Sequence, residues 1–151
     1  MPSLLPTGTV LESNIKQQAS YEFKSTYAYD FVNKKFIKNT DGTIKKLTVF
    51  DSYVVWCHKA LLTTRYMYCI YDYYYGADKI DIVNLDETAI ELEIKRTVKE
   101  CLMVHPLTKS VDNFTFIWTD TRVDYTFELT STLSSKTLMS SSIELRWNLG
   151  N

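Results

Sequence analysis

Residues 86–106 constrain the fold most, because their local signals agree on one amphipathic helix. Asp86 is a favourable N-cap, and Leu85 and Ile90 stand where the two residues of a hydrophobic staple would pack. Apolar residues then recur every three or four positions: Ile90, Ile94, Val98, Cys101 and Leu102. This stripe must face a core. Pro106 cannot continue a helix and restricts the residue before it, so the helix is predicted to end at about Val104.

Length and charge set the broad class. A chain of 151 residues is typical of one domain, and 17 basic against 18 acidic residues leave a net charge of -1. No overall field would attract nucleic acid or an anionic membrane. No apolar run approaches the roughly 20 residues of a membrane span. We therefore expect a protein that folds in the cytosol, with neither nucleic acid nor a membrane as partner.

The cysteines give no sign of chemistry. Cys57, Cys69 and Cys101 are odd in number and form no C-x-x-C pair, which argues against a disulfide framework. Cys101 and His105 are four apart, but one such pair is not a metal site, and a buried thiol beside a C-terminal histidine is the simpler interpretation. Cys57 and His58 are adjacent and would point in different directions on a helix. We predict no catalytic, cofactor-binding or metal-ligating residues.

The N-terminal third is predicted to be an arm followed by a β meander. Residues 1–20 show no clear period and are expected to order only against another element. Aromatic residues then alternate with polar ones from Tyr21 to Phe31, which is typical of a half-buried strand. Residues 36–37 suggest a second strand, and Asp41 with Gly42 would form a hairpin turn into a return strand over residues 43–50.

A second helix is predicted after the meander. Asp51 would be its N-cap, with Phe50 and Val55 as its staple, and the segment YVVWCHKALLTT shows a wide apolar face. Residues 53–56 also favour strands, so periodicity alone leaves a strand open as the alternative.

Residues 65–76 hold six tyrosines in twelve positions. Such a cluster can stack on bases, but Arg65 is its only basic residue and Asp72 offsets it, whereas a nucleic-acid groove needs several cations. Packing or a protein interface, in which tyrosine is enriched, explains the segment better. We name Tyr73, Tyr74 and Tyr75 as candidate partner-interface residues.

After Pro106 the pattern changes to period two. Residues 114–118 and 123–129 alternate between apolar and polar, with TDTR as a turn between them. This predicts an antiparallel hairpin with one face on the helices. The expected fold class is therefore α+β, with two helices packed on a mostly antiparallel sheet. Residues 21–151 would form a single domain.

The C-terminal end offers a second candidate interface. Nine of the thirteen residues 130–142 are Ser or Thr, which predicts an extended, mobile connection to a terminal strand over residues 143–149. That strand either closes its own sheet or offers an edge to another chain. The candidate interface residues here are Ile143, Glu144, Leu145, Arg146 and Trp147.

The order of these signals resembles the sheath-initiator (baseplate wedge) family of contractile phage tails and phage-tail-like bacteriocins. The resemblance runs from about Tyr27 to Leu129 in three blocks. They comprise Ala60, Leu61, Thr63, Arg65, Tyr66, Tyr68, Ile70, Tyr71 and Gly76; then residues 93–100 with Leu102, Val104 and Pro106; then Lys109, Ser110, Val111, Asn113 and Phe114. Better-known phage members carry Glu-Pro-Arg after the second helix, where this chain has His105, Pro106 and Leu107.

The resemblance implies a structural baseplate protein that offers its sheet to extended arms of the first sheath subunits. Its implied partners are sheath subunits, baseplate wedge and hub or tube proteins, and other copies around a symmetric baseplate. The implied location is a phage virion or a tailocin baseplate that assembles in the bacterial cytoplasm. Strand addition would supply attachment through main-chain hydrogen bonds, and repeated copies would add avidity.

Two other function classes compete with this one. Some members of the family have been labelled lysozyme-like, and a peptidoglycan hydrolase needs two carboxylates that flank a sugar. Glu91, Glu93 and Glu100 lie among cations on the polar face of the predicted helix, which would keep their pKa values low. A tyrosine-rich nucleic-acid or ligand-binding module is the other alternative, and the single basic residue of the tyrosine-rich segment argues against it.

Overall fold

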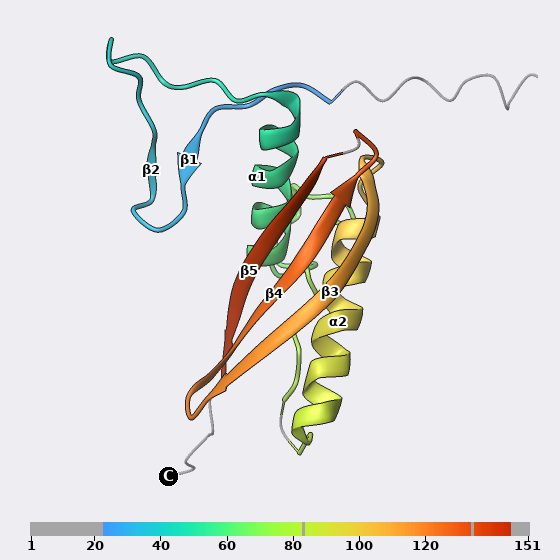
Figure 1. Ribbon diagram of the computed structural model, residues 1–151. Helices are drawn as coiled ribbons and strands as arrows, with labels where there is room; N and C mark the ends of the chain where they lie inside the picture. The colour runs from blue at the N-terminus through green and yellow to red at the C-terminus, as the bar shows by residue number, and fades with distance from the viewer. Residues whose placement is uncertain (1–22, 83, 134, 146–151) are drawn as a thin grey trace, which may run out of the picture.

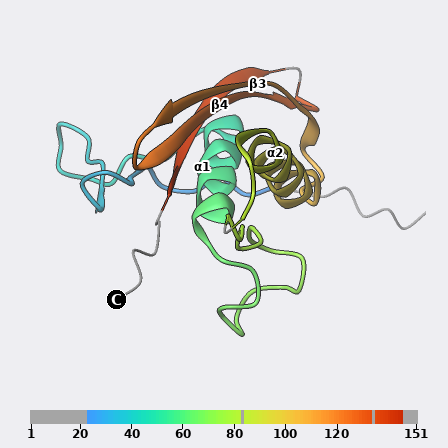
Figure 2. The ribbon, with the colours of Figure 1, turned by 90° about the horizontal axis from the view of Figure 1, so that it is seen from below.

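The computed structural model describes residues 23–82, 84–133 and 135–145, which form two helices and two antiparallel sheets. Helix α1 spans Val49–Leu62 and α2 spans Glu87–Met103. The main sheet has the order β3-β4-β5, with bounds Thr108–Thr119, Arg122–Ser131 and Lys136–Glu144. Both helices lie on one face of this curved sheet (Figures 1 and 2). The predicted α+β class is confirmed.

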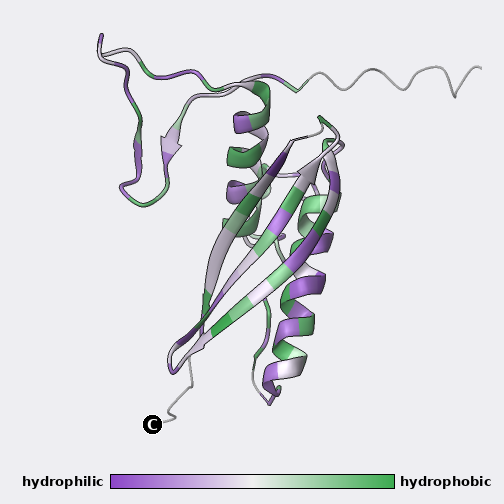
Figure 3. Cartoon of the chain, viewed as in Figure 1, coloured by the Kyte–Doolittle hydropathy of each residue, from purple (hydrophilic) through white to green (hydrophobic). Residues whose placement is uncertain are grey.

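Helix α2 follows its sequence signals closely. The Asp86 side chain accepts a hydrogen bond from the Ala89 N–H at 3.0 Å, and the helix ends at Met103 with Val104 as its C-cap. All five residues of the predicted stripe are buried. Hydrophobic and hydrophilic residues alternate along the helix in Figure 3 as this amphipathic pattern requires. The helix therefore joins the core through the stripe and exposes its charged face.

Helix α1 begins earlier than predicted. Its N-cap is Thr48 and not Asp51, which lies in the first turn. Thr48 Oγ1 accepts from the Asp51 N–H at 3.2 Å and donates to Asp51 Oδ2 at 2.8 Å. This reciprocal arrangement resembles a capping box with aspartate in the acidic position. Residues 53–56, for which a strand was the alternative, belong to the helix because their apolar face packs on α2 and the sheet.

The core lies between the helices and the inner face of β4. Every second residue of this strand is buried, as the alternation predicted: Val123, Tyr125, Phe127 and Leu129. Phe127 has no exposed surface, and its ring stacks against that of Phe114 on β3 with centroids 5.5 Å apart. Tyr53 of α1 is also fully buried, and its hydroxyl hydrogen-bonds the Thr108 hydroxyl at the start of β3. The predicted C-terminal hairpin thus forms two of the three strands of the sheet, with β4 at its centre.

The N-terminal meander is shorter than predicted. It contains only β1, Tyr29–Asp30, and β2, Lys35–Phe36, with isolated bridges where a long return strand was expected. Gly42, with φ of 86°, makes the predicted turn after Asp41. The hairpin stands away from the sheet (Figure 1). Its alternating residues therefore have no sheet to join, and long strands do not form. The predicted arm, residues 1–20, lies outside the described residues.

The prediction of a mobile Ser/Thr-rich connection over residues 130–142 is wrong. Thr130 and Ser131 finish β4, and β5 begins at Lys136 and pairs with β4 in an unbroken antiparallel register. Met139 is buried in this strand, whereas its neighbours Leu138 and Ser140 are exposed. The strand was not recognised in the sequence because most of its residues are small and polar, and only a few large side chains mark the alternation.

Candidate partner interface

The last strand pairs with β4 and forms one edge of its own sheet. It begins at Lys136, not at Ile143 as predicted. Ile143 is half-buried and packs against the core, Leu145 is buried just after the strand, and Glu144 between them is exposed. Among the predicted interface residues, Arg146 and Trp147 lie outside the described residues. The inner side chains of this segment therefore belong to the core, and what remains for a partner is the strand's outer edge.

Backbone geometry identifies the groups on that edge. In an antiparallel pair, opposed residues alternately exchange hydrogen bonds and direct their N–H and C=O groups away from each other. The Leu145 N–H donates to the Thr121 carbonyl at 2.7 Å, and the register between β4 and β5 contains no bulge from there to Lys136. The alternation therefore directs outward the backbone groups of Lys136, Leu138, Ser140, Ser142 and Glu144.

Within the described ranges, no strand pairs with the outer side of β5 at the middle of this edge. In the described part of the chain, no backbone group outside β4 bonds the segment between Lys136 and Ser142. Lys136, at one end, pairs with Glu128 at 2.8 Å, and the residues between the two ends of β5 carry no charge. Natural sheets usually protect their edges with bulges, prolines or inward-pointing charges. The middle of β5 has none of these.

The opposite edge, β3, is less regular. Its pairing with β4 shifts register between Thr108 and Ser110 and again between Asp112 and Thr115. Helix α2 also lies along this strand (Figure 1), and the Lys99 ammonium is 3.6 Å from an Asp112 carboxylate oxygen. Bulges and a neighbouring helix are two ways in which proteins protect an edge. The β5 edge is thus the more suitable of the two for a foreign strand.

The tyrosine-rich segment forms a loop that is closed at its base. The Arg65 N–H donates to the Ala77 carbonyl and the Ala77 N–H donates to the Thr63 carbonyl, both at 2.9 Å. The Arg65 guanidinium also reaches the Gly76 carbonyl and Asp78. Gly76 has φ of 100°, and a Cβ there would lie 2.7 Å from the Thr63 oxygen. Compact surface loops whose ends lie close together are packed by their own side chains.

The three tyrosines predicted as interface residues have different environments. Tyr73 and Tyr74 are 68% and 65% exposed, with ring centroids 5.2 Å apart. Tyr75 is half-buried, lies edge-on to Trp56 at 5.5 Å, and has its pKa raised to about 12 by burial. Tyr75 therefore attaches the loop to α1, and Tyr73 and Tyr74 form the exposed surface.

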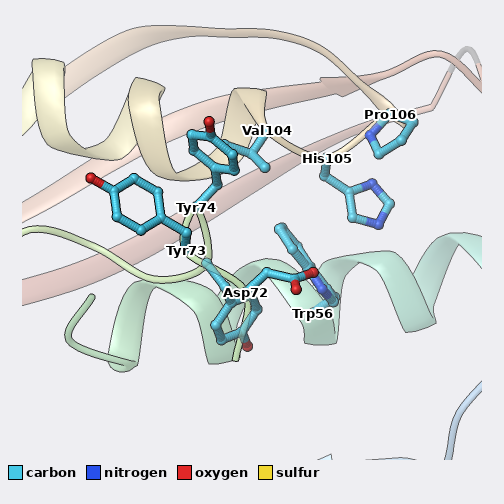
Figure 4. A pocket seen from close by; sticks show the side chains of 8 residues that line it. Trp56, Asp72, Tyr73, Tyr74, Val104, His105 and Pro106 are labelled. Atoms are coloured by element: carbon cyan, nitrogen blue, oxygen red, sulfur yellow. The ribbon is translucent and has the colours of Figure 1, made fainter. Parts of the chain in front are cut away.

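A pocket of about 470 Å³ lies between this loop, α1 and the end of α2 (Figure 4). His105 in its wall is 3% exposed, and its Nδ1 accepts a hydrogen bond from the Leu107 N–H at 3.1 Å. The rings of Trp56, Tyr53 and Phe23 lie 4.4, 4.9 and 5.0 Å from it. Burial lowers the pKa of His105 to about 4, so the imidazole is neutral at neutral pH. His105 therefore supports the pocket wall as an aromatic packing residue.

The polar residues of the described regions show no catalytic arrangement. Glu93 and Glu100 both pair with Arg96, and Glu91 accepts from the Trp118 indole at 3.1 Å. Burial raises the pKa values of the Cys57 and Cys101 thiols to about 12, which keeps them protonated. Within the described ranges, no group of three or more His, Cys, Asp or Glu side chains is placed to hold a metal ion. Neither described helix combines the length and apolarity needed to cross a membrane.

Sequence reasoning missed the residues on the outer edge of β5. Leu138, Ser140 and Ser142 lay in a segment interpreted as a connection. A usable signal was present, because Met139 and Ile143 are four apart and fall on one face of a strand with Thr137 and Ser141. Serine does not favour strands by itself, so pairing with β4 decides the conformation.

A comparison with protein families matches residues 25–135 to the contractile injection system sheath initiators. The chain belongs to this family. The match covers β1 to β4 and both helices and ends one residue before β5. A comparison with curated proteins finds no match.

As a member of this family, the protein has a structural role in a contractile tail and takes part in sheath assembly at the baseplate. The role requires contact with sheath and baseplate components. The family is a structural one.

Proposed function

We propose that this sheath initiator starts sheath assembly by accepting an extended arm of a first-ring sheath subunit at the outer edge of β5. The observation that supports this most is the regular, uncharged middle of that edge, where the backbone of Leu138, Ser140 and Ser142 is directed away from β4. Addition of a strand to such an edge is an established mode of peptide recognition. Main-chain hydrogen bonds supply the attachment, and side chains that alternate between the two faces set the register.

The expected strength fits a reversible first contact. Three outward residues offer about six backbone groups, and each new hydrogen bond contributes about 0.5–1.5 kcal/mol net. Ordering the arm offsets much of this gain. A single arm is therefore held weakly, and several copies around a symmetric baseplate would hold a complete first ring by avidity.

The loop with Tyr73 and Tyr74 is our candidate for the contact with baseplate wedge, hub or tube proteins. Exposed tyrosines are typical of protein interfaces, and the adjacent pocket offers an apolar depression for a partner side chain. The particle would be a phage virion or a tailocin, assembled in the bacterial cytoplasm. In this arrangement the loop holds the sheath initiator to the baseplate while β5 receives the sheath.

Ser140→Pro tests the edge directly. The alternation directs the Ser140 N–H away from β4, so proline removes an outward donor and obstructs a docking strand without breaking a bond to β4. We expect a folded protein that joins the baseplate but gives tubes without sheath in electron micrographs. Deletion of β5 is less informative, because Met139 in this strand belongs to the core.

Two variants control this experiment. Ser140→Thr keeps the N–H and should support sheath of normal length. Ser141→Pro removes an N–H directed toward β4 and should lower the stability of the fold itself. Normal sheath on baseplates that carry folded Ser140→Pro protein would refute strand addition at this edge.

A further inference from the structure

The hairpin over residues 27–46 is an ordered element that buries little of itself: Ala28 is buried, and the Phe31 ring lies 5.6 Å from that of His58 on α1. It lies beyond α1, away from the sheet and α2 (Figures 1 and 2). Every residue from 32 to 46 is exposed, and four of these are large and apolar: Val32, Phe36, Ile37 and Ile44. An isolated two-stranded hairpin is marginally stable in water at best. The exposed apolar surface of the hairpin is therefore suited to contact with another protein surface.

Local hydrogen bonds shape the hairpin in advance. Asp30 accepts from the N–H groups of Val32 and Asn33, at 2.9 and 3.1 Å, in the first turn. Asp41 accepts from the Thr43 N–H at 2.9 Å in the second turn. Both acidic residues of the hairpin are thus used internally. A preformed element loses little conformational entropy when a partner covers it.

The remaining charge of the hairpin is positive. It contains five lysines, which are Lys34, Lys35, Lys38, Lys45 and Lys46. None of them forms an ion pair with a described residue. Because the whole chain has a net charge of -1, the rest of it is acidic. The hairpin therefore presents a largely apolar groove with a border that is mostly basic. It is lined by Phe36, Ile37 and Ile44 together with Lys35, Lys38, Asn33 and one carboxylate, Asp30.

A complementary surface lies at the start of α2. Residues 80–94 contain five acidic residues and no basic one, and one of the five, Glu93, forms an ion pair with Arg96. Exposed leucines lie among these charges, with Leu85 37% and Leu92 60% exposed. This acidic end and the hairpin lie on opposite sides of α1 in both views, so they do not meet within one molecule (Figures 1 and 2).

We propose that the hairpin of one sheath initiator docks on the acidic end of a second copy, with apolar residues at the centre and opposite charges at the border. The two surfaces differ, so the contact is heterologous. Such contacts repeat head to tail and form a ring when the rotation between copies closes. This contact is independent of the β5 edge, and either proposal can fail without the other.

The size of the hairpin predicts a weak contact between free proteins. A short exposed hairpin buries less area than the roughly 1,200–2,000 Å² of a standard stable interface. Charge complementarity at the border makes association sensitive to salt, because the Debye length is only about 8 Å at physiological ionic strength. Attachment of several copies to one baseplate would raise their effective concentration.

Sedimentation velocity of the full chain tests the proposal. Concentrations up to about 1 mM reach contacts with a dissociation constant of about 1 mM. We expect wild-type protein to associate at low salt and to dissociate as salt is raised. Lys35→Glu with Lys38→Glu should abolish association, and so should Asp81→Lys with Glu87→Lys. An equimolar mixture of these two double variants should restore it, because each then meets a surface of opposite charge.

The control changes the net charge equally at another place. Lys59 and Lys109 are exposed outside the hairpin, so Lys59→Glu with Lys109→Glu should leave association unchanged. Phe36→Ser removes apolar surface without changing the net charge or the core, and it should weaken association. This variant keeps the proposal testable if the acidic-end variant fails to fold. A wild-type monomer over the whole range, or no recovery on mixing two folded variants, would overturn the proposal and assign the hairpin to a different protein.

Discussion

Ile94→Asp is the most direct perturbation of the core. Ile94 lies in the middle of the buried stripe of α2 and has no exposed surface. Removing its side chain to alanine would cost about 2–5 kcal/mol, because it loses apolar burial and leaves a cavity. Aspartate adds the cost of burying a carboxyl group without a partner, which is several kcal/mol more. The sum approaches or exceeds the total stability of about 5–15 kcal/mol of a typical domain.

The same helix offers a matched control. Leu92 is two residues away and 60% exposed, so Leu92→Asp makes the same change in chemistry outside the core. We expect it to cost about 1 kcal/mol or less, chiefly through helix propensity. Urea unfolding followed by circular dichroism should show a cooperative transition for wild type and Leu92→Asp, and none for Ile94→Asp. A soluble Ile94→Asp protein with a transition near that of wild type would show that the core is misplaced.

Three further predictions follow from local contacts. Burial lowers the pKa of His105 to about 4 from its usual 6.5. Between these two pH values the unfolded chain binds more protons than the folded one, so the free energy of unfolding falls as the pH is lowered. In urea titrations, wild type should therefore lose about 2 kcal/mol more than His105→Gln between pH 7 and pH 5. Gly76→Ala should loosen the tyrosine loop and raise its hydrogen exchange, whereas Gly42→Ala, with nothing within 4 Å of the added Cβ, should leave the loop protected. Thr48→Ala should cost about 0.5–2 kcal/mol in thermal unfolding through loss of the α1 cap, and an unchanged melting temperature would contradict that role.

The sequence was most informative where local signals and burial agree. Helix α2 was predicted correctly from its cap, Asp86, and its apolar stripe, and β4 from the alternation between Val123 and Leu129. The stripe and the alternation were reliable because each marks one buried face. The start of α1 was wrong by a few residues because Thr48 and Asp51 are both good caps, and only their mutual hydrogen bonds show which residue begins the helix.

Elsewhere tertiary context decided the structure. The Ser/Thr-rich stretch becomes β5 because β4 supplies a pairing partner, which no local propensity encodes. The aromatic alternation from Tyr21 to Phe31 gives only a short strand, because the hairpin lies away from the sheet. The sequence next to His105 did not indicate that aromatic rings surround this side chain. Those rings come from α1 and from residue 23, which are distant in the sequence.

The central claim, that β5 receives a foreign strand, is tested most directly by an electron-microscopy reconstruction of the junction between baseplate and first sheath ring. We predict a sheath arm paired with β5, with main-chain hydrogen bonds to Leu138, Ser140 and Ser142. An assembled sheath that contacts the protein elsewhere and leaves this edge unpaired would contradict the claim.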